Sequence, residues 1–236
     1  MLNKFISLAK LTSIHPKLFL LSRDVIITNK TFLGYPQLLG LVENFRIASH
    51  RTTQPMQIAE FGVGRGGSSA ILAWLINRYG GCLFLYDIFS RIPPPTEFDG
   101  IRANERYEFI VNKESPDYYG NIDNLMDIIK TELKAICPLE RIEFIQGKYE
   151  EVLPHKVDRH SYNLVHIDCD WYSSIRTVFN FLKTNLHPGA ILQIDDYYTW
   201  QGAKKAVDEV EWLKQFHRRS LGNALVIDTG ISASKV

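Results

Sequence analysis

Short apolar runs that alternate with amphipathic segments constrain the fold of this chain more than any other feature of its sequence. The runs are MQIAEF (56–61), CLFLYDIF (82–89), RIEFIQG (141–147), YNLVHIDCD (162–170) and AILQIDDY (190–197). Segments with a helical period separate most of them, as in 68–79, 121–136 and 173–186. Strands that alternate with helices form right-handed βαβ units in a mostly parallel sheet. The sequence therefore predicts an α/β fold whose ligands bind at the carboxyl ends of the strands.

The segments outside this alternation give further expectations. Residues 1–55 are predicted to form an N-terminal helical cap, and residues 56–236 a single globular unit. Residues 101–119 are polar and aromatic without a clear period, so we expect an insertion or lid there. Asn121 is a candidate cap for the helix over 121–136. Near the C-terminus we expect a helix over 202–216, followed by two short strands around a turn at Asp228-Thr229-Gly230.

The composition excludes several classes of function. The 236 residues are 45% hydrophobic and 22% charged, with a formal net charge of +1, and lack the basic excess of a nucleic-acid binder. The three cysteines form no CxxC pair, which disfavours a disulfide framework or zinc site and fits a cytoplasmic protein with reduced thiols. Lysines interrupt the apolar N-terminus, so no membrane span is expected there, and a weak membrane or partner contact is the alternative to a helical cap.

A glycine-rich turn follows the first run. It consists of Glu60, Gly62, Val63, Gly64, Gly66, Gly67 and Ser68, in the order EFGVGRGGS. The glycines allow a sharp turn and the close approach of a ligand, and their spacing also satisfies the G-x-G-x-x-G pattern of dinucleotide dehydrogenases. A carboxylate at Glu60 would repel a pyrophosphate but suits the cationic methionine end of S-adenosylmethionine. We therefore expect S-adenosylmethionine at this turn, with an NAD-dependent oxidoreductase as the alternative.

The next strand ends supply candidates for the nucleoside. Asp87 follows the glycines by about 20 residues, where an acid binds ribose hydroxyls in nucleotide-binding α/β folds. Gln146 and Gly147 end the run 141–147, at a position expected for the adenine. Asp168, at the end of the run 162–170, is expected to border the cofactor as well.

Aspartates gather at the ends of the last two runs. Asp168 and Asp170 end one run, and Asp195 and Asp196 end the next. If these strands are neighbours, the carboxylates converge and need protons or a cation to relieve their repulsion. Hard oxygen ligands without a nearby Cys/His set indicate Mg²⁺, or alternatively Ca²⁺ or Mn²⁺. We expect Asp168, Asp195 and Asp196 as the metal ligands, with Asp170 beside the metal, facing the substrate or capping a helix.

Other side chains near these acids have less specific interpretations. His166 lies within an apolar strand and is expected to be a packed core residue rather than a catalyst. Aromatic residues follow the acids, and we expect most to pack and one or two to stack on the acceptor. They are Trp171, Tyr172, Tyr197, Tyr198 and Trp200.

At these residues the chain resembles the macrocin O-methyltransferase family, bacterial enzymes that methylate sugar hydroxyls of macrolides and related natural products. The similar stretches span about residues 57–235 and are AEFGVGRGGSS, YDIFSRIPPP, IEFIQGKYEEVLP, HIDCDWYSSI, IDDYYTWQGAKKAVDE and IDTGISASK. The resemblance implies a Rossmann-like class I methyltransferase fold, with a seven-stranded sheet whose last strand is antiparallel. It also implies S-adenosylmethionine as the donor, Mg²⁺ at Asp168, Asp195 and Asp196, and makes a homo-oligomer plausible.

The expected function is thus an S-adenosylmethionine- and Mg²⁺-dependent O-methyltransferase of a hydroxyl on a sugar or similar small natural-product acceptor. Asp168 is the candidate catalytic residue, holding the metal and receiving or relaying the hydroxyl proton. The alternatives are the same chemistry on a catechol or phenol, the NAD-dependent oxidoreductase, and a non-catalytic domain with the same fold.

Overall fold

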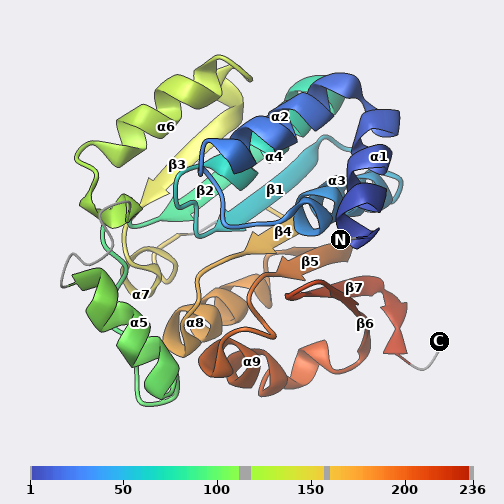
Figure 1. Cartoon of the computed structure of the whole chain (residues 1–236). Coiled ribbons are helices and arrows are strands. Elements are labelled where there is room, and N and C mark those ends of the chain that lie inside the picture. Colours follow the sequence, from blue (N-terminus) through green and yellow to red (C-terminus); the bar gives the residue numbers. More distant parts are fainter. Residues whose placement is uncertain (1, 112–117, 157–159, 234–236) are drawn as a thin grey trace.

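A sheet of seven strands in the order β3-β2-β1-β4-β5-β7-β6 forms the centre of the computed structural model, which describes residues 2–111, 118–156 and 160–233 (Figure 1). The strands are β1 (Met56–Phe61), β2 (Gly81–Asp87), β3 (Ile142–Gln146), β4 (Tyr162–Ile167), β5 (Leu186–Ile194), β6 (Phe216–Leu221) and β7 (Ala224–Ser232). Strands β1 to β5 pair in parallel, whereas β7 runs antiparallel to both β5 and β6. The prediction of a mostly parallel sheet with an antiparallel last strand is confirmed.

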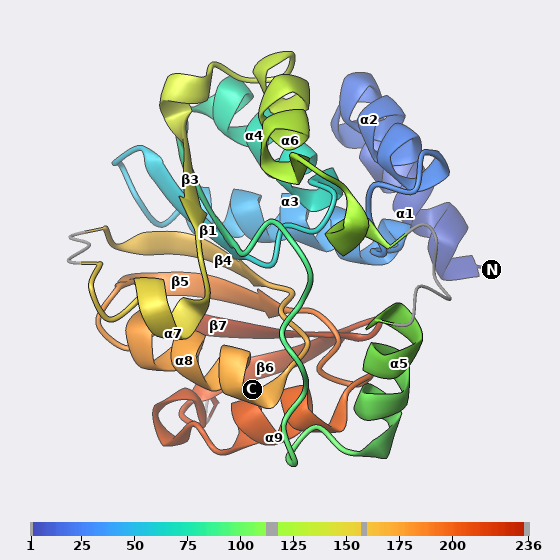
Figure 2. The ribbon, with the colours of Figure 1, turned by 90° about the vertical axis from the view of Figure 1, so that its left-hand side faces the viewer.

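Helices cover both faces of this sheet (Figures 1 and 2). One face carries α1 (Leu2–Ile14), α2 (Pro16–Ile27), α3 (Tyr35–Ser49), α4 (Gly67–Tyr79) and α6 (Leu125–Lys134). The other face carries α7 (Tyr149–Val152), α8 (Tyr172–Leu182) and α9 (Gln201–Asp208), and α5 (Ile101–Val111) stands beyond the sheet on that side. Successive residues of a strand point to opposite faces, so Ile58 joins the apolar cluster under α1–α4 and Ala59 the cluster under α8 and α9.

The register of the central strands brings the candidate site together. Phe61 is paired with Ile167, and Ile167 with Ile194, so β1, β4 and β5 end at the same level. The strand order reverses between β1 and β4, and ligands of doubly wound sheets bind in the crevice at such a reversal. The residues after these three strands therefore face one common space.

The N-terminal segment is helical, as predicted, and packs on the sheet. Inside the molecule, the Asn44 side chain of α3 donates a hydrogen bond of 2.9 Å to Gln193 of β5. Just beyond α3, Arg51 forms a two-pronged ion pair with Asp228 of β7, with distances of 2.6 and 2.9 Å. Among the described residues, no helix has both the length and the apolar character needed to cross a bilayer.

Of two predictions around residues 101–124, the insertion or lid over 101–119 stays a prediction, and the helix cap at Asn121 was wrong. Part of the segment without a clear period forms α5, which buries Ala103 and Ile110 against the body. Its period is hard to recognise because the large side chains of Ile101 and Phe109 are exposed. Residues 112–117 of that segment lie outside the described residues. Helix α6 begins at Leu125, and Asn121 belongs to a short 3₁₀ turn ahead of it.

The prediction for the C-terminal region was also wrong in detail. Helix α9 ends at Asp208, and the remainder of the expected helix gives a 3₁₀ turn and the first residue of β6. The hairpin turn lies at Gly222-Asn223, with a left-handed φ of +61° at Gly222, while Asp228-Thr229-Gly230 lies within the continuous strand β7. The sequence of β6, FHRRSL, has no apolar alternation because it forms the sheet edge.

Candidate active site

The turn after β1 requires glycine at its first position. Gly62 has a φ of +92°, and a Cβ on it would lie 1.9 Å from the carbonyl oxygen of Asp168. Gly64 and Gly66 also have left-handed φ values, and Gly66 is the N-cap of α4. The amide of Gly67 donates a hydrogen bond of 3.1 Å to the carbonyl of Lys30, so the segment between α2 and α3 rests on this turn.

Glu60 lies beneath the turn and is completely buried. Its carboxylate accepts hydrogen bonds from the Ser69 hydroxyl and from the His166 ring, whose Nδ1 lies 2.9 Å away. Burial opposes a charge on His166, but the Glu60 carboxylate outweighs it and raises the pKa of the imidazole. His166 is thus a packed core residue, as its strand predicts. Glu60 holds the first turn of α4 from below, and its direct contact with a donor molecule stays a prediction.

A cavity, which we call the donor cavity, opens beside this turn. Four of the predicted cofactor residues line it: Gly62, Asp87, Gly147 and Asp168. The Asp87 carboxylate accepts hydrogen bonds from the amides of Val63 at 2.6 Å and Phe89 at 2.6 Å, and burial raises its pKa. Asp87 therefore fixes the shape of the glycine turn while facing the cavity.

The other predicted cofactor residues lie around the donor cavity without lining it. Val63 is held by Asp87, and Gly66, Gly67 and Ser68 lie at the start of α4. Gln146 is exposed, and its side chain donates a hydrogen bond of 3.4 Å to the carbonyl of Ile88. Its neighbour Gly147 is the member of the pair that faces the cavity.

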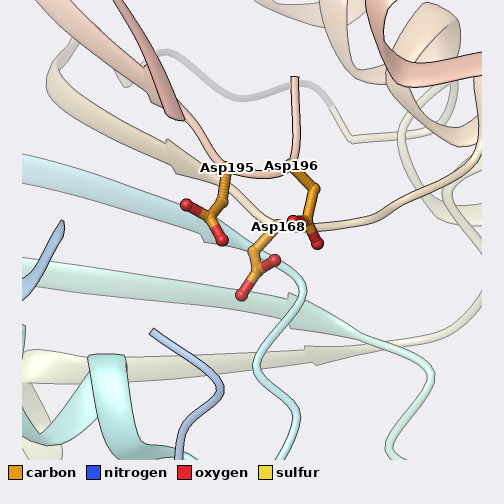
Figure 3. A group of neighbouring side chains, drawn as sticks. All are labelled: Asp168, Asp195 and Asp196. Carbon is orange, nitrogen blue, oxygen red and sulfur yellow. The ribbon is translucent and has the colours of Figure 1, made fainter. Parts of the chain in front are cut away.

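The three aspartates predicted as metal ligands converge (Figure 3). Each of Asp168, Asp195 and Asp196 offers an oxygen, and these oxygens all lie within 4.8 Å of one another. Asp168 follows β4, while Asp195 and Asp196 follow β5, so the parallel pairing of the two strands creates the cluster. One oxygen of Asp195, Oδ1, is buried without a hydrogen-bond partner.

The electrostatics of the cluster disfavour full ionisation. Burial together with the neighbouring Asp196 and Asp170 raises the pKa of Asp195 to about 8. Burial and Asp195 likewise raise the pKa of Asp168 well above its ordinary range. Asp170, which has a left-handed φ of +52°, is hydrogen-bonded to Asp196 and to Trp200. A cation would relieve this repulsion.

A second cavity, which we call the acceptor cavity, meets the donor cavity at the acids. Asp168 and Asp170 line both cavities, as do Ile92, Tyr119 and Trp171. Asp196 and Trp200 line the acceptor cavity alone, so two of the aromatic residues named from the sequence, Trp171 and Trp200, border it. The site thus has two compartments with an acidic boundary.

Sequence reasoning missed several residues of the acceptor cavity. Tyr119 separates the two compartments, and burial together with Asp87 raises the pKa of its hydroxyl well above the ordinary value. Arg106 and Ile110 come from α5, and Phe32 from the segment between α2 and α3. These residues lie in segments without a recognisable motif. The sequence did contain one signal for these residues: Arg106 lies at helical spacing between the apolar residues Ala103 and Ile110.

Comparison with known proteins decides the family. The family model described as macrocin-O-methyltransferase (TylF) matches residues 31–220, which is most of the chain. The chain belongs to the macrocin O-methyltransferase family. No curated protein sequence matches the chain closely enough to count as a relative.

Solved structures share the fold of this macrocin O-methyltransferase family member. The O-methyltransferase NovP superposes with a TM-score of 0.71 at 17% identity, over 84% of this chain and 81% of NovP. The calicheamicin methyltransferase CalS11 gives 0.70 at 18% identity, over 96% and 92% of the two chains. A putative caffeoyl-CoA O-methyltransferase from Staphylococcus aureus gives 0.63 at 15% identity, over 97% and 99%.

Membership of the family answers the question that the glycine spacing left open. The chain is an S-adenosylmethionine-dependent O-methyltransferase rather than an NAD-dependent oxidoreductase. In this family member, Asp168 and Asp170 line both the donor cavity and the acceptor cavity.

Proposed function

We propose that this enzyme transfers a methyl group to a hydroxyl of a sugar or similar small natural-product acceptor, with Mg²⁺ held by Asp168, Asp195 and Asp196. The meeting of the two cavities at Asp168 carries the proposal. In-line transfer requires the acceptor oxygen, the methyl group and the sulfur to be aligned, and two adjoining cavities that share lining residues would let the two reactants meet in that way.

The acidic cluster fits a hard divalent cation. Its donors are three carboxylates with oxygens within 4.8 Å of one another, and no Cys or His belongs to the group. Oδ1 of Asp195 is buried and accepts no hydrogen bond from the described residues, so it is free to bind a cation. Bound there, Mg²⁺ would lower the pKa of the acceptor hydroxyl and orient it.

The residues of the chain itself then have distinct tasks. Gly62 lets the backbone approach the donor, Asp87 faces the ribose, and Gly147 borders the adenine end of the donor cavity. Asp168 lines both compartments, which supports its carboxylate as the group that receives the proton lost by the acceptor hydroxyl. Tyr119 and Trp171 line both compartments and would pack against the two reactants.

A sugar acceptor is supported by the family description and by one structural neighbour. The family is that of macrocin O-methyltransferases, and CalS11 is described in another of its structures as a TDP-rhamnose 3'-O-methyltransferase. A catechol would use the same metal chemistry. Labelled S-adenosylmethionine offered with a panel of glycosides and catechols separates the two acceptor classes, and transfer to catechols alone contradicts the sugar proposal.

The metal is tested by replacing one ligand with its uncharged isostere. We predict that Asp195→Asn lowers Mg²⁺-stimulated methyl transfer at least about a hundredfold, since loss of a metal ligand removes several kcal/mol of charge stabilisation. Binding of S-adenosylhomocysteine, measured by calorimetry, should remain, because Asp195 does not line the donor cavity. Asp24→Asn, an exposed acid of α2, serves as the control. Full activity of Asp195→Asn in the presence of a chelator would rule out the metal.

A further inference from the structure

Arg106 occupies an unusual position on α5. The helix turns Ala103 and Ile110 toward the body, and both are buried. Arg106 lies between them on the same face, three residues after one and four before the other, and its side chain is half-buried. It lines the acceptor cavity, where it is the one basic side chain among the described lining residues. The inward face of α5 thus presents a guanidinium to the space in front of the acids.

Among the residues that the structure describes, the guanidinium of Arg106 has no anionic partner. Within the described parts of the chain it makes no ion pair and no hydrogen bond, and its contact is with the Phe109 ring, whose centroid lies 5.7 Å away. Asp168, Asp170 and Asp196 line the same cavity, yet none of them is paired with it. None of the Arg106 nitrogens is among the buried atoms that lack a partner, so they face the open space of the cavity. Its five donors remain available to something that enters the cavity.

We infer that Arg106 binds an anionic group, a phosphate or a carboxylate, carried by the acceptor; this rests on the proposed function, which places the acceptor in this cavity. The planar guanidinium donates paired hydrogen bonds that match the oxygens of both groups. The anionic group lies on the α5 side of the acceptor, and the reacting hydroxyl on the acidic side. Phe32, which is 74% exposed, and Trp200 supply flat surfaces along the remaining wall.

A neighbouring arginine provides the matched control. Arg102 lies on the same helix but does not line the cavity; its guanidinium lies 5.1 Å from the Trp200 ring and donates a weak hydrogen bond of 3.4 Å to the carbonyl of Thr199. If Arg106 only offset the negative charge of the aspartates at a distance, removing Arg102 would weaken binding of an anion about as much as removing Arg106. If Arg106 binds the anion directly, removing Arg106 weakens anion binding much more than removing Arg102 does.

The test measures binding to the full-length protein loaded with S-adenosylhomocysteine and Mg²⁺. Calorimetry with UDP-glucose, glucuronate and methyl glucoside compares a diphosphate, a carboxylate and a neutral sugar. We expect one of the anionic probes to bind at least about tenfold more tightly than methyl glucoside. Arg106→Ala should weaken binding of that probe by roughly ten- to a hundredfold, the range for hydrogen bonds to charged groups. Arg106→Lys, which keeps the charge, should lose less affinity than Arg106→Ala. Arg102→Ala should change its affinity by less than about threefold.

The outcomes separate this inference from the proposed function. Whichever anionic probe loses affinity in Arg106→Ala identifies the group as phosphate or carboxylate. The inference is overturned if neither anion binds better than methyl glucoside, or if the Arg106 and Arg102 variants lose affinity equally. Thermal unfolding of each variant shows whether α5 remains folded. S-adenosylhomocysteine binding, measured first on the same samples, shows that the donor cavity is intact, because Arg106 does not line it. Mg²⁺-dependent methyl transfer to a neutral glycoside tests the proposed function separately, because such an acceptor carries no anionic group for Arg106.

Discussion

Gly62 links the two strands on which the candidate active site depends. Its φ is +92°, and the 1.9 Å that would separate a Cβ at this position from the Asp168 carbonyl oxygen leaves no room for a side chain. We predict that Gly62→Ala destabilises the protein both through the left-handed φ, about 1–3 kcal/mol, and through overpacking, about 1–3 kcal/mol more. Urea unfolding followed by circular dichroism measures the loss.

Gly80 separates the two contributions. It also has a positive φ, +89°, but nothing lies within 4 Å of a Cβ placed on it. Gly80→Ala should therefore show the backbone cost without the overpacking. Equal losses for Gly62→Ala and Gly80→Ala would mean that the contact between the glycine turn and Asp168 contributes nothing.

For single residues, the sequence predicted which side chains lie at the ends of strands, but it did not predict which side chains contact one another. Asp168, Asp195 and Asp196 could be placed together because each directly follows an apolar run, and parallel strands bring such positions to one edge. The partners of Glu60 could not be predicted, since His166 comes from a strand more than a hundred residues away. Tyr119 likewise reaches the site from a segment whose path no local pattern determines.

At the scale of elements, Arg51 connects the end of α3 to the sheet through hydrogen bonds. Arg51 bonds both carboxylate oxygens of Asp228 and also the carbonyl of Gly189 at 3.0 Å, so it joins α3 to β5 and β7. The side chains of Arg51 and Asp228 are 26% and 11% exposed, so water screens their ion pair only weakly. We predict that Arg51→Ala costs about 1.5–3 kcal/mol of unfolding free energy, the range for hydrogen bonds to charged groups.

A second ion pair of the N-terminal helices is the comparison for Arg51. Lys10 and Glu43 approach to 3.4 Å with side chains 56% and 34% exposed, and make a single contact. Because exposed pairs contribute little, Lys10→Ala should cost less than about 1 kcal/mol. Chemical denaturation of both variants under one salt condition tests the order; a loss for Lys10→Ala as large as that for Arg51→Ala would contradict this account.

Elements were predictable where one face is strongly apolar. Strands β1, β2, β4 and β5 are buried along most of their length and read as continuous apolar runs. Helix α5 and the edge strand β6 bury few side chains, so tertiary contacts rather than a local pattern decide their conformation. The part of the acceptor cavity that α5 forms was therefore not predictable.

At the scale of the whole molecule, the acidic cluster links metal binding to stability. Asp168, Asp195 and Asp196 converge from two central strands, with Asp170 beside them, so their mutual repulsion acts against the folded sheet. Any cation that binds this folded arrangement and not the unfolded chain stabilises the protein by RT ln(1 + [L]/Kd), which is about 2.7 kcal/mol at a hundredfold excess over Kd. For a chain of this size, that energy raises the Tm by several degrees.

We therefore predict that Mg²⁺ raises the Tm of chelator-treated protein, measured by differential scanning calorimetry across a magnesium titration. The rise should grow with the logarithm of concentration above Kd, as linkage requires. Sodium chloride at matched ionic strength should not reproduce it, because screening weakens exposed charges far more than a buried group. Asp195→Asn should lose most of the rise and Asp24→Asn should keep it. If Mg²⁺ raised the Tm of both variants equally, the ion would bind somewhere other than the aspartates at the ends of β4 and β5. The proposed role of the metal in catalysis would then be wrong.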